Sequence, residues 1–136
     1  MKKLLPALAA GLFLFGCSDK KAQENALRDS VMTVHEKVMN ADEQLLKNKT
    51  ALDGVIKQNP NGALNDSAKV YQDKVVMADS AMDVWMHNFN PDLTTKSHEE
   101  NMTYMAKQKK LIMQIDSQMD AAISASGKFL AKTKTK

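Results

Sequence analysis

Cysteine is nearly absent from this chain of 136 residues, in which Cys17 is the single example. One thiol excludes an intramolecular disulfide, the thiolate-rich sites of structural zinc and the C-x-x-C-H motif of c-type haem. Glycine and proline are also scarce, with five and three residues, and none of the glycines forms a phosphate-binding loop. The composition therefore excludes several common cofactor and nucleotide sites.

Catalytic and nucleic-acid-binding patterns are lacking as well. The serines and threonines are scattered, without a histidine in a triad-like context, and the paired E-x-x-H motifs of di-iron bundles are missing. Aromatic residues make up 5% of the chain, and no long basic stripe is interleaved with them. We therefore expect neither an enzyme nor a nucleic-acid-binding protein.

The first residues have the pattern of a secretory signal. Lys2 and Lys3 precede an apolar run from Leu4 to Phe15, which is too short to span a bilayer comfortably. The run ends in Leu-Phe-Gly-Cys at residues 14–17. These four residues resemble a bacterial lipobox, with the small Gly16 just before the cysteine. We predict a lipoprotein signal peptide over residues 1–16.

A lipobox predicts that Cys17 is acylated and becomes the mature N-terminus. Two or more acyl chains hold a protein firmly on a membrane, whereas one chain does so only marginally. The alternative is a free buried thiol behind an ordinary signal peptide. We expect a protein anchored in the cell envelope, with Ser18 favouring the outer membrane; the leaflet, facing the periplasm or the surface, stays open.

The rest of the chain has helical periodicity. Apolar residues recur every three or four positions, and no segment alternates as a strand does. "NPNG" at 59–62 and Pro91 interrupt the pattern, and Ser97 stands three residues before Glu100, as in a capping box. This predicts an all-α fold: three long antiparallel helices in an up-down-up bundle, the third beginning at His98. We assign residues 17–25 to the lipidated cysteine and a tether, 26–131 to the bundle and 132–136 to a basic tail.

The repeating apolar positions predict the core. They form one row in each of the first two helices and two adjoining rows in the third. The expected core residues are Leu27, Val31, Val34, Val38, Ala41, Leu45, Leu52 and Val55; then Leu64, Ala68, Tyr71, Val75, Ala78, Met82, Trp85 and Phe89; and finally Tyr104, Leu111, Ile115, Ala122 and Phe129 beside Met105, Ile112, Met119, Ile123 and Leu130.

Methionine is abundant, with ten residues. Several methionines lie three or four positions from a histidine, and so share a helix face with it. Folding the chain at residue 60 and again near residue 93 places His35, Trp85 or Met86, and Met102 in one layer, at the end nearest Cys17. Thioether and imidazole groups together suit Cu(I), or Ag(I) as its soft mimic. The candidate metal ligands are Met32, His35, Met39, Met82, Met86, His98, Met102 and Met105.

The alternative for these methionines is packing. Methionine is a flexible core filler that packs well on aromatic rings, and Met82 stands within the expected core row. Trp85 is expected to be a core anchor with its N–H near the end of the bundle, and His87 a surface residue.

Three blocks of sequence resemble a known group. "VHEKVM" (34–39), "MDVWMHNF" (82–89) and "SHEENMTYMAKQKKLI" (97–112) are similar to a group of short, uncharacterised bacterial lipoproteins, some of which carry the label "viral A-type inclusion protein". The resemblance implies a helical lipoprotein and brings no activity with it. We therefore expect a structural or protein-interaction role at the envelope, with a membrane and an unknown envelope protein as partners; the alternative is soft-metal binding.

Overall fold

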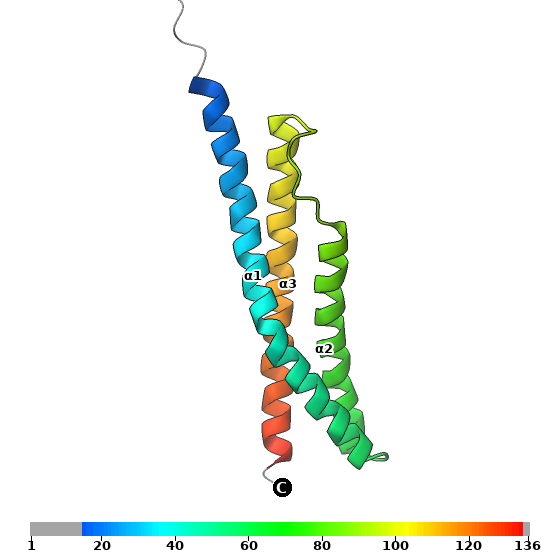
Figure 1. Cartoon of the computed structure of the whole chain (residues 1–136). Helices are drawn as coiled ribbons and strands as arrows, with labels where there is room; N and C mark the ends of the chain where they lie inside the picture. Colours follow the sequence, from blue (N-terminus) through cyan, green and yellow to red (C-terminus); the bar gives the residue numbers. More distant parts are fainter. Residues whose placement is uncertain (1–14, 135–136) are drawn as a thin grey trace, which may run out of the picture.

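The computed structural model describes residues 15–134 and contains three helices over that range: α1 (Phe15–Gln58), α2 (Ala63–Asn88) and α3 (His98–Thr133). Each helix packs against the other two. The chain runs along α1, back along α2 and forward again along α3, so that α1 and α3 are parallel (Figure 1). The predicted all-α up-down-up bundle is confirmed.

The core follows the predicted apolar rows closely. On α1, fully buried residues recur every seven positions, and on α2 and α3 most of the expected positions are buried or half-buried. Two expected core residues are wrong: Leu64 is 40% exposed and Leu111 is 37% exposed. Leu64 lies in the first turn of α2, where the bundle ends, and Leu111 lies at the edge of α3 beside a surface groove.

The two connections use different local chemistry. Gly62 adopts a φ of +112° immediately before α2, a backbone conformation that side-chain-bearing residues rarely adopt. Before α3, the Ser97 side chain accepts a hydrogen bond from the backbone N–H of Glu100, and the Glu100 carboxylate accepts one from the backbone N–H of Ser97. The predicted capping box and the start of α3 at His98 are confirmed.

The assignment of residues 17–25 to a tether needs correction, because this segment is helical and belongs to α1. It contains good helix formers such as Ala22 and Gln23, and Glu24 is bonded to α3, with its Oε1 2.8 Å from Nδ1 of His98. Lys132 and Thr133, expected in the tail, likewise belong to α3. The proposed signal peptide lies largely outside the described residues, as do the side chain of Cys17 and residues 135–136.

A polar layer joins the parallel helices α1 and α3. The buried Asn48 amide donates to Oγ of Ser126 at 2.8 Å and to the backbone oxygen of Ile123 at 3.0 Å. Nearer the start of α1, Nζ of Lys37 lies 2.7 Å from Asp116 and 3.1 Å from Asp120. These contacts fix the register of α1 against α3, because each pairs residues 75 to 83 positions apart.

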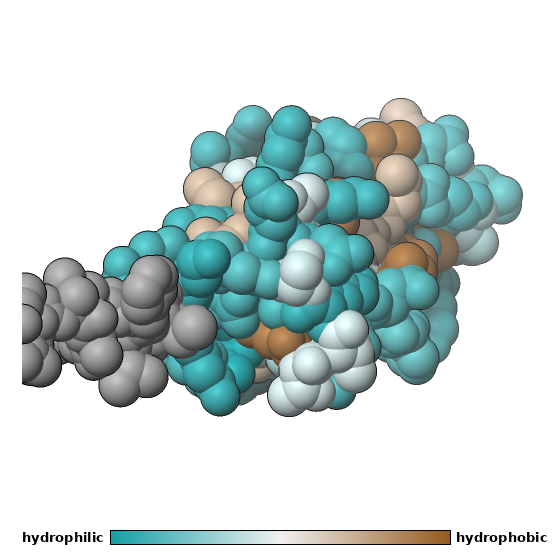
Figure 2. Space-filling view, turned by 90° about the horizontal axis from the view of Figure 1, so that it is seen from above, coloured by the Kyte–Doolittle hydropathy of each residue, from teal (hydrophilic) through white to brown (hydrophobic). Residues whose placement is uncertain are grey.

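Figure 2 views the molecule from above, towards the end at which α1 begins. Hydrophilic residues dominate this surface, and hydrophobic residues are exposed only in separate patches. Among the described residues, no helix combines the length and the apolar character needed to cross a membrane.

Candidate functional site

The register between α1 and α2 is the predicted one. The His35 and Trp85 rings lie 5.7 Å apart, and the Asn65 amide donates to the backbone oxygen of Ile56 at 3.0 Å. In each pair, the midpoint between the two residue numbers is close to 60, the position at which the chain was expected to fold back. The prediction that His35 meets Trp85 across the first two helices is therefore confirmed.

The register between α2 and α3 differs from the prediction. Trp85 is hydrogen-bonded to Gln108, and Phe89 stacks on Tyr104 with ring centroids 6.4 Å apart. The midpoint between the residue numbers of each pair lies between 96 and 97, rather than near 93 as expected. The connection climbs along the bundle before α3 begins (Figure 1). Asn101, which precedes Met102, donates to Glu24 at 3.3 Å, and Met102 consequently lies on the order of 10 Å along the helix axis from the layer of His35. The prediction that His35 and Met102 lie in one layer is therefore wrong.

The predicted metal ligands thus fall into two groups. His98, Met102 and Met105 belong to α3, where His98 is already bonded to Glu24 and Met105 is fully buried. The other group lies along the facing sides of α1 and α2, by helical periodicity and the His35–Trp85 contact. It comprises Met32, His35, Met39, Met82 and Met86.

A groove on the α1–α2 side brings three of these thioethers together. It has a volume of about 250 Å³. Met82 is almost fully buried, whereas Met39 and Met86 are 42% and 39% exposed. We call it the methionine groove; it is lined by Met39, Asp42, Asp79, Ser80, Met82, Asp83 and Met86.

Carboxylates make the methionine groove acidic, and the sequence analysis missed them. Burial, and to a smaller degree the negative charge of Asp79, raises the pKa of Asp42 above its usual value. Asp83 lies 3.4 Å from Nδ1 of His87, and both side chains are exposed. The signal was present in the sequence, because Asp42 follows Met39 by three positions and Asp79 precedes Met82 by three.

His35 has an unusual environment between α1 and α2. Its Nδ1 atom is buried without a hydrogen-bond partner among the described residues. Its ring faces Trp85, which itself stacks on Phe89 with centroids 4.6 Å apart. The expectation that Trp85 anchors the core is confirmed, but its N–H does not lie at the end of the bundle: it donates to Gln108 in the interior.

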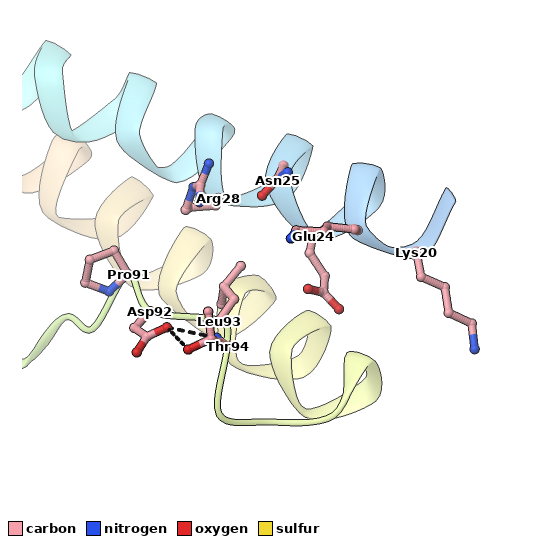
Figure 3. Close-up of a pocket in the computed structure, with 9 residues that line it drawn as sticks. Lys20, Glu24, Asn25, Arg28, Pro91, Asp92, Leu93 and Thr94 are labelled. Carbon is pink, nitrogen blue, oxygen red and sulfur yellow. Dashed lines mark hydrogen bonds between the residues drawn. The ribbon is translucent and has the colours of Figure 1, made fainter. Parts of the chain in front are cut away.

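A second depression lies between the start of α1 and the connection before α3, with a volume of about 470 Å³. Figure 3 shows Glu24 extending from α1 towards α3, and Asp92 bonded to Thr94 in the connecting loop. These hydrogen bonds lower the pKa of Asp92. Cationic side chains from Lys20, Lys21 and Arg28 also line the depression, which therefore carries charges of both signs.

The third feature is a groove between α2 and α3. It consists of two adjoining depressions of about 360 and 310 Å³, both lined by Gln118. Its apolar side chains include the exposed Met77, Val84 and Leu111. Periodicity did not identify this surface, although Val70, Met77 and Val84 recur every seven positions on α2.

Comparison of the chain with protein-family models, with curated proteins and with solved structures found no match. Within the part of the chain that the structure describes, no group of three or more His, Cys, Asp or Glu residues is placed to hold a metal ion.

Proposed function

We propose that the protein is a lipid-anchored, extracytoplasmic helical bundle with a structural role at the cell envelope, which pairs with a second copy of itself through the groove between α2 and α3. The exposed apolar lining of that groove is the observation that carries the interaction role. The lipobox ending at Cys17 carries the anchor.

The start of α1 suits an anchor close to the membrane surface. Cys17 lies within the helix that begins at Phe15, and the bond between Glu24 and His98 ties this helix to α3. Such a helix transmits the orientation of the bundle to the membrane better than a flexible tether would. Lys20 and Lys21 follow the cysteine within about one turn, where each basic side chain adds about 1 kcal/mol of attraction to anionic headgroups.

The groove between α2 and α3 has the character of an unfilled helix-packing surface. Met77 and Val84 are 62% and 58% exposed on α2, and Leu111 of α3 lines the same depression as Val84. A fourth helix placed against such a groove would complete a four-helix arrangement, the usual way for amphipathic helices to bury an apolar edge.

The anchor favours a second copy in one orientation. Two copies held in the same leaflet have their Cys17 ends at the same level, so their two-fold axis runs parallel to the bundle. That axis sets α2 of one copy against α3 of the other, antiparallel, since α2 and α3 run in opposite directions within one chain (Figure 1). Each copy then fills half of the other's groove.

Disulfide trapping tests the pairing in membranes. Because an acylated Cys17 has no free thiol, an introduced cysteine is the only reactive one in the mature chain. We expect Val84→Cys, co-expressed with a differently tagged Leu111→Cys, to form a mixed disulfide dimer, since both residues line the same part of the groove and the Trp85–Gln108 bond places them at nearly the same level. The control pair Glu36→Cys and Asn40→Cys, exposed on α1, should remain monomeric. Equal trapping of both pairs, or none of the first, would refute the pairing.

Mass spectrometry of the mature N-terminus tests the anchor separately. Cys17 should carry a diacylglycerol, and Cys17→Ser should leave an unprocessed or soluble chain. An unmodified Cys17 thiol in membrane fractions would refute the anchor without bearing on the groove.

A further inference from the structure

We propose that the methionine groove between α1 and α2 binds a single soft monovalent cation, Cu(I) or its mimic Ag(I), through the thioethers of Met39, Met82 and Met86. This inference does not depend on pairing of the chain, since the methionine groove and the groove between α2 and α3 lie on different sides of α2.

Core packing accounts for only some of the methionines. Met105 and Met119 are buried and fill gaps between helices, as does Met82. Met39 and Met86 bury too little surface for that explanation to suffice, because each is about two-fifths exposed. They nevertheless converge from two helices on one groove, with Met82 almost fully buried beneath the surface. Convergence distinguishes them from the exposed Met77 and Met113, which line other depressions.

The donor set selects the cation. Thioether sulfur is a soft, neutral ligand that favours Cu(I), whereas Mg²⁺ and Ca²⁺ require oxygen ligands. The carboxylates around the groove do not form a group of three placed to hold a metal ion in the described residues. Zinc is disfavoured because the groove offers no thiolate or imidazole ligand.

The carboxylates supply charge where the thioethers cannot. Asp42 and Asp79 face each other across the groove from different helices, and neither has an ion-pair partner among residues 15–134. Their mutual repulsion raises the free energy of the empty groove, and a bound monovalent cation relieves it. Burial, and to a smaller degree this repulsion, raises the pKa of Asp42.

Nuclear magnetic resonance of methionine methyl groups tests the site directly. The mature lipidated chain in detergent micelles would be labelled with ¹³C at its methionine methyls and titrated with Ag(I) against an excess of free methionine. We expect the methyl signals of Met39, Met82 and Met86 to shift and to saturate at one equivalent. The signals of Met77 and Met113 should stay unchanged. Equal shifts at all exposed methionines, or no saturation at one equivalent, would overturn the site.

Matched variants sharpen the result. Met39→Leu with Met86→Leu should abolish saturable binding, and Met77→Leu with Met113→Leu, which removes as many exposed thioethers, should leave it unchanged. Leucine nearly conserves volume, so folding should survive in both. Asp42→Asn with Asp79→Asn should weaken binding about tenfold, a size typical of losing nearby charge in a partly solvated site. Displacement of Ag(I) by Ca²⁺ at equal concentration would show an oxygen site and overturn the proposal.

Discussion

Trp85 and Gln108 are joined by a buried hydrogen bond of 2.9 Å, from the indole Nε1 to the amide Oε1. Trp85 is 6% exposed and Gln108 is 9% exposed. The bond sets the register of α2 against α3, because a buried N–H group without a partner is costly. A shift of α3 by one turn would break it.

The first prediction concerns this bond. Gln108→Leu should lower the free energy of unfolding by about 1–3 kcal/mol, because it leaves the buried indole N–H of Trp85 without a hydrogen-bond acceptor. Trp85→Phe with Gln108→Leu should cost less than the sum of the single changes, because both remove one interaction. Urea unfolding of the mature chain measures the free energy of unfolding of Trp85→Phe, Gln108→Leu and the double variant. Strict additivity would show that the bond contributes nothing to stability.

The same contact explains why part of the candidate site was unpredictable. The turn at residues 59–62 is so short that helices on either side must face each other symmetrically about it, and His35 was correctly matched with Trp85. The connection at 89–97 is longer and climbs along α3 (Figure 1). The position of this connection along α3 depends on Asn101, whose buried amide donates to the backbone oxygen of Leu93 at 2.8 Å. Periodicity cannot reveal such a bond from side chain to loop, so Met102 was misplaced.

Periodicity identified the buried row of α2 but not the use of a second apolar row on the same helix. The heptad spacing of Val70, Met77 and Val84 matches that of Val31, Val38 and Leu45, yet the first row is exposed and the second is fully buried. A three-helix bundle covers only one side of each helix, and pattern alone does not indicate that an uncovered apolar row borders a groove. The groove between α2 and α3 was therefore invisible until the helices were packed.

The second prediction concerns two glycines that differ in conformation. A Cβ atom at Gly54, inside α1, would meet nothing within 4 Å, so Gly54→Ala should raise the free energy of unfolding by about 0.5–1 kcal/mol. Gly62→Ala should lower it, because the φ of +112° strains any residue with a side chain. Thermal unfolding of the two variants should move the midpoint in opposite directions. A shift of the same sign would contradict the backbone assigned to one of them.

The third prediction concerns the start of α1. Glu24 accepts from Asn101 at 3.3 Å in addition to its contact with His98. Glu24→Ala should therefore free the first turns of α1 and speed amide hydrogen exchange before about residue 27, since Leu27 is the first apolar residue of α1 that packs against the core. Glu43→Ala is the control, because Glu43 pairs only with Lys47 on the exposed face of the same helix among the described residues. Unchanged exchange in Glu24→Ala would mean that the segment is held by other contacts.

The last prediction concerns pH and the pair formed by Asp42 and Asp79. Burial and the Asp79 charge raise the pKa of Asp42 in the folded state, so the folded chain binds this proton more tightly than the unfolded chain does. The resulting destabilisation is present above the folded pKa and disappears as the pH falls below 3.8, the ordinary pKa of an aspartate side chain. Asp79→Asn removes the repulsive part, and should stabilise the chain at pH 7 but not at pH 3.

The comparison must be a difference between variant and parent at each pH, because other carboxylates act in the opposite direction. Hydrogen bonds from Ser97 lower the pKa of Glu100, so its contribution to stability is lost as the pH falls through that lowered value. This loss is common to parent and Asp79→Asn and cancels in the difference. Glu36→Gln, an exposed change elsewhere on α1, is the control for lost negative charge. A stabilisation by Asp79→Asn that persists undiminished at pH 3 would show that Asp42 and Asp79 do not interact through charge.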